Sequence, residues 1–168
     1  MVTGLFNDRD SAENAYNSVA ARGYGKDDIN LVMSDETRKT HFGAAGNTKT
    51  ELGTKAAEGA GVGGAIGGTL GAIAAAVAAV GTSIAIPGLG LVIAGPLAAA
   101  IAGAGAGGAA GGLVGALIGW GIPEERVKRY ESGIKSGGIL MGVKARSNDD
   151  AKYFQDEWKR SNGTEIYA

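Results

Sequence analysis

An uncharged segment of 65 residues, from 59 to 123, constrains this chain more than any other feature. All 16 basic and 17 acidic residues lie outside it, in residues 1–58 and 124–168, while twenty of the 31 glycines lie inside it. The average composition, 20% charged and 45% hydrophobic, hides this division. The charged flanks suit contact with water, whereas the middle segment needs another apolar surface to enclose it.

The glycines of the middle segment recur at every fourth residue in two runs. Residues four apart share one face of a helix, so each run forms a ridge without side chains along which another backbone can approach closely. An aliphatic stripe that includes Ile73 lies beside the first ridge. We predict helix packing and oligomerisation through the two ridges, which consist of Gly59, Gly63, Gly67 and Gly71, and of Gly103, Gly107, Gly111, Gly115 and Gly119.

This spacing predicts two long helices joined by a connector. Residues 59–81 and 96–121 give helices of 23 and 26 residues, about 35–39 Å each, against a bilayer hydrocarbon core of about 30 Å. The connector, residues 82–95, is rich in turn-forming residues. We therefore predict a Gly/Ala-rich helical hairpin over 59–122, long enough to cross a membrane twice, with its turn at Pro87, Gly88, Gly90 and Pro96.

Two kinds of surroundings are open for such a hairpin. Lipid favours helix because the backbone finds no other hydrogen-bonding partner there, which offsets a cost of about 1 kcal/mol per glycine in water. Residues 102–112, however, are only Gly and Ala and suit another helix better than lipid. The leading interpretation is a membrane-associated homo-oligomer. The alternative is a water-soluble homo-oligomer or filament whose hairpins bury one another.

Basic residues on both sides of the hairpin predict its orientation. Lys49 and Lys55 precede it, Arg126, Lys128 and Arg129 follow it, and the connector carries no charge. By the positive-inside tendency, both flanks lie in the cytoplasm and the hairpin lies in a bacterial inner membrane. The alternative location is a cytoplasmic soluble assembly.

Each charged flank follows a strand-helix-strand order. In the first flank, residues 2–6 and 29–33 have strand character, and Asp8 to Asp10 offer caps for the helix between them. The second flank repeats this order, with strands at 138–144 and 164–167. Neither half covers a sheet face alone, so we predict an α+β fold, a ferredoxin-like split β-α-β sheet with two helices on one face and the long hairpin inserted.

Apolar spacing also predicts which residues of the flanking helices point inward. The stripe of the first helix is Ala12, Ala15, Tyr16, Val19 and Ala20, and that of the last helix is Ala151, Phe154 and Trp158. A further helix, 123–136, begins at Pro123 and places Val127, Tyr130 and Ile134 on one face.

The predicted organisation has four parts. Residues 34–50, rich in Ser, Thr, Asn and Gly, indicate a linker. Trp120, at the end of the hairpin, suits either an interfacial anchor or packing against the next helix. The parts are a first β-α-β half at 1–33, a linker and lead-in helix at 34–58, the hairpin at 59–122, and a helix plus second half at 123–168 that completes one domain with the first.

No residue pattern predicts a catalytic, cofactor or metal site. His41 lies in a polar stretch without neighbouring ligands, and the acid pairs Asp27-Asp28 and Asp149-Asp150 sit where capping explains them. The GxGxxG matches at Gly59–Gly64 and Gly103–Gly108 lack a preceding strand and an acidic ribose partner. Cysteine is absent, and acids interleave with bases at a net charge of −1, which disfavours nucleic-acid binding.

Three stretches together resemble a known family. They are Val2–Asp8 with Asp28–Ser34, then Ile86–Leu97, and finally Gly119–Glu125 through Tyr130–Met141. They resemble the bacterial general-stress or heat-induced stress proteins that carry a glycine-zipper hairpin. The resemblance covers nearly the whole chain, implies a stress-linked and non-enzymatic protein, and supplies no catalytic residue.

The sequence therefore predicts a non-enzymatic, self-associating, membrane-associated stress-response protein. Its expected partners are copies of itself and lipid, with no nucleic acid, no cofactor and no identified small-molecule substrate. A soluble assembly is the first alternative, and a small-molecule sensor or enzyme with a pocket on the sheet is a distant one.

Overall fold

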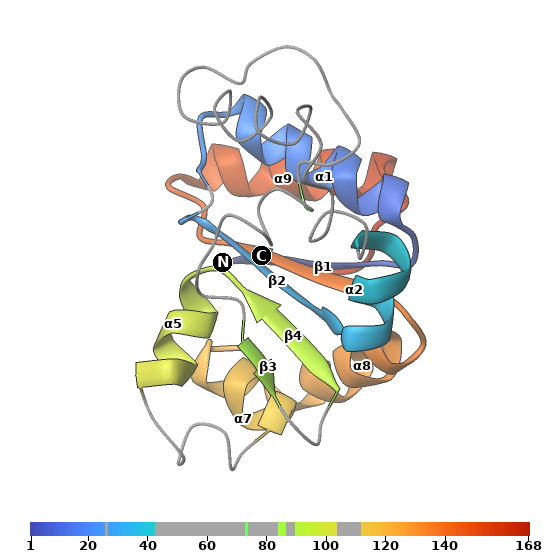
Figure 1. Cartoon of the computed structure of the whole chain (residues 1–168). Coiled ribbons are helices and arrows are strands. Elements are labelled where there is room, and N and C mark those ends of the chain that lie inside the picture. The colour runs from blue at the N-terminus through green and yellow to red at the C-terminus, as the bar shows by residue number, and fades with distance from the viewer. Residues whose placement is uncertain (26, 43–72, 74–83, 87–89, 104–111) are drawn as a thin grey trace, which may run out of the picture.

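The computed structural model of this chain describes residues 1–25, 27–42, 73, 84–86, 90–103 and 112–168 (Figure 1). Its strands are β1 (Val2–Phe6), β2 (Ile29–Ser34), β3 (Ile84–Ile86), β4 (Leu91–Ala94), β5 (Ile139–Val143) and β6 (Thr164–Tyr167). Its helices are α1 (Arg9–Ala21), α2 (Asp35–Phe42), α5 (Pro96–Gly103), α7 (Gly112–Gly119), α8 (Glu124–Lys135) and α9 (Asn148–Arg160).

The strands form one six-stranded antiparallel sheet in the order β3-β4-β2-β5-β1-β6. Strand β5 of the second flank lies between β2 and β1 of the first, and Val143 is opposite both Ile29 and Val2. The two flanks therefore share one sheet, as predicted. The α+β class is also confirmed.

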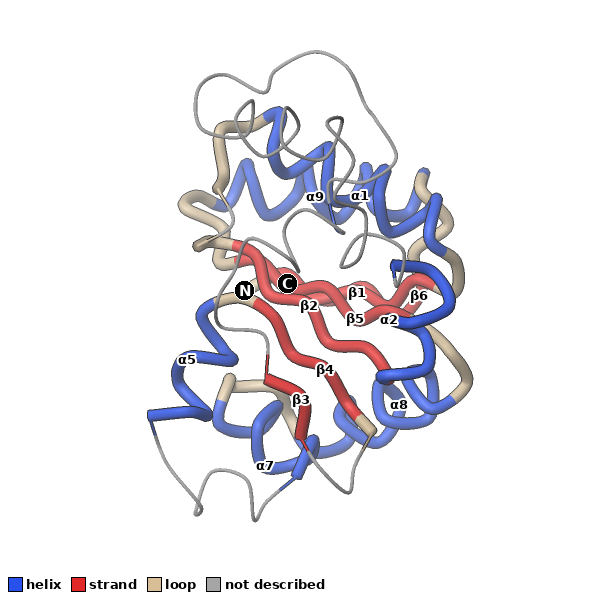
Figure 2. Tube along the Cα trace, in the orientation of Figure 1, coloured by secondary structure: helices blue, strands red, loops and turns tan. Residues whose placement is uncertain are grey.

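Helices cover both faces of this sheet. Helices α1 and α9 lie side by side on one face, and α5, α7 and α8 lie on the other (Figures 1 and 2). The prediction of two helices on a single face is therefore incomplete. The uncharged segment supplies α5 and α7, and the end of that segment leads into α8.

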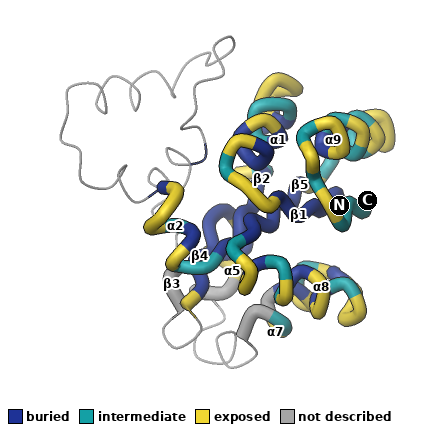
Figure 3. The backbone as a smooth tube through the Cα atoms, turned by 90° about the vertical axis from the view of Figure 1, so that its right-hand side faces the viewer, coloured by how far each residue is buried: buried dark blue, intermediate teal, exposed yellow. Residues whose placement is uncertain are grey.

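Strict alternation of side chains explains this double cover. In β5, Ile139, Met141 and Val143 belong to the core on the α1/α9 side, and Leu140 belongs to the core on the other side. Strands β1, β4 and β5 are consequently buried along their length, whereas the edge strand β6 is partly exposed and the outer sides of α1, α8 and α9 are exposed (Figure 3). Such two-sided burial needs nearly continuous apolar strands, which β1, β2, β4 and β5 provide.

Most helix boundaries of the flanks follow the predicted signals. Asp8 caps α1 by accepting the Ser11 backbone N–H at 2.8 Å, and Pro123 precedes α8. The predicted inward stripe of α8 is confirmed, since Val127, Tyr130 and Ile134 are all buried. In α1 the prediction is wrong for Ala20, which is exposed, while Glu13 is buried.

The connector 82–95 is not the turn of a helical hairpin. It contains β3 and β4, and β4 extends the sheet by pairing with β2. Leu91–Ala94 is apolar on both sides, which is compatible with a fully buried strand, and its pairing with β2 makes it one. Gly90 precedes β4 with a φ of +60°, and its carbonyl accepts the Asp35 backbone N–H at 2.6 Å.

The linker interpretation of 34–50 is wrong for residues 35–42, which form α2. Ser34 begins this helix by accepting the Thr37 backbone N–H at 2.9 Å. Asp35 then pairs with Arg38 and Lys39 one turn later. The serine cap and these local ion pairs explain why a polar sequence without an apolar stripe is helical here.

The predicted helix 59–81 lies outside the described residues, except for Ile73, which is helical. The predicted helix 96–121 corresponds to α5 and α7, and residues 104–111 between them lie outside the described residues. Among the helices that the structure describes, none has both the length and the apolar character needed to span a bilayer.

Candidate self-association surface

Helix α5 is fixed to the sheet by a buried polar residue. Asn30 points from β2 toward the helix, and its side-chain oxygen accepts the Leu97 backbone N–H at 2.7 Å. Pro96 opens the helix, as predicted, and Gly95 precedes it with a φ of +100°. A Cβ on Gly95 would overlap the Ile29 carbonyl oxygen, so the backbone approaches β2 as closely as glycine allows.

Helix α7 packs against α8 and the same face of the sheet. Leu117 is fully buried, and the indole of Trp120 lies on Gly142 of β5, where any Cβ would overlap the ring. This contact supports a packing role for Trp120, but its partner is strand β5, whereas the predicted partner was the following helix.

The other side of α7 presents small and apolar residues to solvent. Gly115 and Gly119 are exposed, and a Cβ built on either would meet no atom within 4 Å. Ile118 beside them is 46% exposed. Positions 115, 118 and 119 share one helical face. We call these three residues the α7 outer face.

The remaining predicted ridge residues divide into two groups. Gly103 is the last residue of α5, and of the predicted turn residues Gly90 and Pro96 are described. The other predicted positions lie outside the described residues, namely Gly59, Gly63, Gly67, Gly71, Gly107, Gly111, Pro87 and Gly88.

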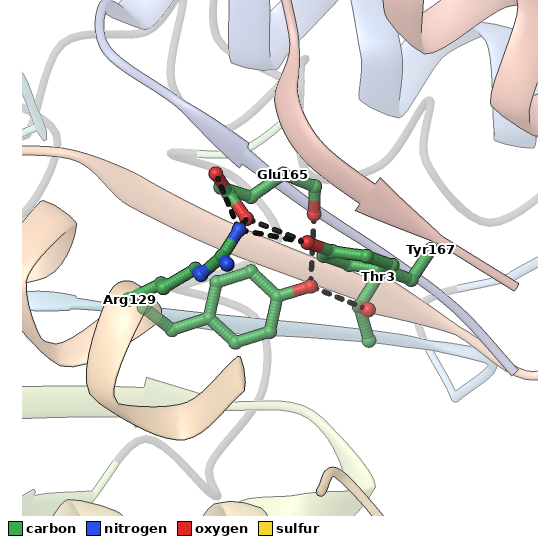
Figure 4. A network of polar contacts seen from close by, with 5 residues as sticks. Thr3, Arg129, Glu165 and Tyr167 are labelled. Atoms are coloured by element: carbon green, nitrogen blue, oxygen red, sulfur yellow. Dashed lines mark hydrogen bonds and ion pairs between the residues drawn. The ribbon is translucent and has the colours of Figure 1, made fainter. Parts of the chain in front are cut away.

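A buried hydroxyl network holds α8 against the edge strand β6 (Figure 4). The Tyr130 hydroxyl lies 2.8 Å from the Thr3 hydroxyl and donates to the Glu165 carbonyl at 2.9 Å. Glu165 has a φ of +48°, at a point where the register between β6 and β1 shifts. The bulge aims this carbonyl at Tyr130.

Charged groups surround the rim of this network. Arg129 pairs with the Glu165 carboxylate at 3.1 Å, and the Tyr167 hydroxyl donates to the same carboxylate at 2.7 Å (Figure 4). These hydrogen bonds lower the pKa of Glu165, the one from Tyr167 most. Burial raises the pKa of Tyr130 to about 12, so this phenol keeps its proton, and with it the hydrogen bond to Glu165, well above neutral pH.

One member of each acid pair makes a cross-link, and the capping explanation is wrong for the second pair, because Ser147 caps α9 by accepting the Asp150 backbone N–H at 3.0 Å. Asp28 accepts the Gly25 backbone N–H at 2.9 Å and pairs with Arg146 at 2.8 Å. Asp150 accepts the Tyr24 hydroxyl at 2.7 Å and pairs with Arg22. These contacts join the α1–β2 loop to the start of α9.

His41 lies at a polar hollow between α2 and the end of α8. The hollow has a volume of about 280 Å³ and is lined by Ser34, Glu36, Thr37, Thr40, His41, Lys135, Ser136 and Gly137. Thr37 crosses its floor by donating to the Gly137 carbonyl at 3.2 Å. Within the described part of the chain, no group of three or more His, Cys, Asp or Glu residues is arranged to hold a metal ion.

Two of the five buried polar residues in the described part of the chain, Asn30 and Glu13, lie where the apolar pattern predicts a hydrophobic residue. Asn30 interrupts an apolar strand and Glu13 interrupts the inward face of α1. A polar residue within an apolar pattern is the sequence signal for such a position, because a buried polar side chain requires a hydrogen-bonding partner elsewhere in the fold. Comparison of the chain with protein-family models, with curated proteins and with solved structures finds no match.

Proposed function

We propose that this protein is a non-enzymatic, self-associating module whose copies meet through their glycine-rich segments, including the α7 outer face. The observation that carries the proposal is the open, apolar surface at Gly115, Ile118 and Gly119. The stress-response role implied by the family resemblance is part of the proposal.

The α7 outer face is not needed for the core of its own domain. The inner side of the same helix already buries Leu117, and the sheet face beneath it is covered by α5, α7 and α8. A partner backbone can approach Gly115 and Gly119 without displacing a side chain, which increases dispersion contacts along the helix. An isoleucine beside them adds apolar area that a partner would remove from water.

We further infer that the flanks form the ferredoxin-like split β-α-β arrangement. In its support, the flank strands follow the order β2-β5-β1-β6, and α1 and α9 lie on one face. The β3-β4 hairpin then extends this arrangement at the β2 edge.

The contacts of α5 and α7 favour an assembly in which copies of the protein bury one another. They disfavour a hairpin that crosses a membrane twice. Leu97 and Leu117 both belong to the core on one sheet face, and only residues 104–111 separate the two helices. Eight residues reach about 26 Å when fully extended, which is too short to cross a hydrocarbon core of about 30 Å and return. Membrane association therefore remains a prediction for residues 59–81 alone.

The substitution Gly115→Leu tests the proposal. The leucine would point into open space, so the sheet domain should keep its stability while the approach of a partner is blocked. We expect the assembly to shift to smaller particles in size-exclusion chromatography with light scattering. Ala20→Leu, an exposed change of the same kind on α1, is the control and should leave particle size unchanged.

If particle size is unchanged in both Gly115→Leu and Gly119→Leu, copies do not associate through the α7 outer face. The same variants at Gly107 and Gly111 extend the test along the predicted ridge. Separation of cell membranes with carbonate and detergent extraction tests the membrane prediction, since recovery without detergent contradicts it.

A small-molecule-binding role is the second candidate, and the hollow beside His41 is the observation that favours it. Its lining is polar, with hydroxyl, imidazole, ammonium and carboxylate groups from two helices. Binding of small polar metabolites from a compound panel, lost in Thr40→Leu, would support this role. If no compound of the panel binds, the small-molecule-binding role is wrong and self-association is the one proposed function that remains.

A further inference from the structure

Glu13 is a carboxylate buried in the α1 side of the core. It is 1% exposed, and the Arg9 Nε atom lies 3.8 Å from one of its carboxylate oxygens. Burial of a carboxylate is costly unless hydrogen bonds compensate it. One of these bonds comes from the uncharged middle segment, because the Ile73 backbone N–H donates to Glu13 at 3.1 Å.

Ile73 is itself part of the core of the sheet domain. Its side chain is fully buried, in the cluster that contains Ala12, Phe42 and Val92. A residue of the glycine-rich segment therefore docks on its own domain by two contacts of different kinds. One contact is an aliphatic side chain, and the other is a hydrogen bond to a buried charge, which is stronger than one between neutral groups.

The docked position competes with association through the same segment. Ile73 lies on the aliphatic stripe that accompanies the glycine ridge of residues 59–71. One side chain cannot be buried in its own core and packed against another copy at the same time. Docking of Ile73 therefore removes part of the stripe from the association surface.

We propose that Glu13 is a latch that holds Ile73 on its own sheet domain and so limits self-association through the stripe to which Ile73 belongs. This inference rests on the proposed self-association. It predicts two states of the molecule, one with Ile73 docked on α1 and one with Ile73 released and available to a second copy.

The test compares Glu13→Ala and Glu13→Gln with Asp156→Ala, which removes an exposed acid from α9 on the same side of the sheet. We expect Glu13→Ala to raise the association constant at least about tenfold, because loss of a charge-assisted bond destabilises the docked state. Glu13→Gln keeps an acceptor oxygen and should give a smaller increase. Asp156→Ala should match the unchanged protein.

Amide hydrogen exchange at Ile73 provides a readout that does not depend on assembly. The exchange of this N–H should be at least about tenfold faster in Glu13→Ala than in the Asp156→Ala control. Unchanged exchange overturns the latch in any state of assembly. If Glu13→Ala fails to fold, as judged by near-ultraviolet circular dichroism, Glu13→Gln takes its place in both measurements.

The assembly results also separate this inference from the proposed function. If Gly115→Leu dissociates the assembly but the Glu13 variants associate no more strongly, the latch is wrong and self-association stands. If the unchanged protein and all variants remain monomeric at every concentration, self-association is wrong. Weaker association in Glu13→Ala would mean that docking promotes assembly, which contradicts the latch.

Discussion

At the scale of single residues, glycines in the strands seat large aromatic side chains. Trp120 lies on Gly142 from one face of the sheet, and Trp158 lies against Gly4 from the other, with its ring 2.9 Å from a Cβ built there. Both tryptophans thereby approach the backbone of adjacent strands. These strand glycines are packing positions, unlike Gly115 and Gly119, which face open space.

We predict that Gly142→Ala destabilises the fold by about 1–3 kcal/mol, because the added methyl group displaces the Trp120 ring. Urea denaturation followed by tryptophan fluorescence measures this change. Gly115→Ala is the control and should be neutral or stabilising by up to about 1 kcal/mol, since it adds a helix-favouring residue in open space. Equal stability of the two variants would contradict the close packing of Trp120 on Gly142.

Tyr130 gives a second prediction for a single residue. Tyr130→Phe leaves the Thr3 hydroxyl and the Glu165 carbonyl without this partner, which should cost about 1–3 kcal/mol at neutral pH. The folded-state pKa of Tyr130, about 12, lies above its ordinary value of 10.0. The unfolded chain therefore loses this proton first, and the associated stability falls between these two pH values.

The difference in stability between the wild-type protein and Tyr130→Phe should accordingly shrink from pH 8 to pH 11. Denaturant midpoints at both pH values measure it, and Tyr153→Phe serves as the control on α9. A difference that stays constant or grows would show that the Tyr130 hydroxyl does not remain protonated in the fold.

At the scale of elements, α5 depends on a cap that comes from another element. Asn30 belongs to β2, yet it takes the place of a local capping residue by accepting the Leu97 N–H. The sequence before α5 offers no polar side chain for this role, since Gly95 and Ala94 precede Pro96. The strand therefore determines where the helix starts.

We expect Asn30→Ala to destabilise the protein by about 0.5–2 kcal/mol through loss of this cap. The Leu97 amide should also exchange faster with solvent, because its N–H loses its acceptor. Asn17→Ala, on the partly exposed side of α1, is the matched control. Slow exchange at Leu97 in Asn30→Ala would show that another group caps α5.

At the scale of the whole molecule, a polar cross-link fastens the two halves at one end of the sheet. The Tyr24 hydroxyl donates to the Asp150 carboxylate and accepts the Arg146 backbone N–H, both at 2.7 Å. The guanidinium of Arg146 lies 4.1 Å from the centre of the Tyr24 ring. The hydrogen bond from Tyr24 is the main cause that lowers the pKa of Asp150.

A lowered carboxyl pKa has a defined consequence for acid stability. The stabilisation from Asp150 is present above its ordinary pKa of 3.8 and is lost as the pH falls through the lower folded-state pKa. We therefore expect Asp150→Asn to lower the urea midpoint at pH 7, by an amount that decreases toward pH 2. Asp149→Asn, an exposed neighbour in α9, should show a smaller effect at pH 7. An equal effect of both variants would contradict the cross-link.

The sequence by itself determined the elements whose signals are local. Charge separation marked the flanks, and apolar spacing with caps such as Asp8 located β1, α1, β2, α8, β5, α9 and β6 close to their observed bounds. These signals suffice because caps act over a few residues and hydrophobic periodicity reflects which side of an element is buried. Of the second glycine ridge, Gly103, Gly115 and Gly119 lie among the described residues, and association through this ridge stays a prediction.

Only the tertiary structure determined that Leu91–Ala94, within the uncharged segment, is a strand of the sheet. Leu91–Ala94 has no charge or turn within it to distinguish a buried strand from a hairpin connector, and its pairing with β2 settles the matter. Asn30 and Glu13 likewise acquire their partners, Leu97 and Ile73, from positions far along the chain. Sheet pairing and the satisfaction of buried polar groups are long-range effects, so no local pattern in the sequence specifies them.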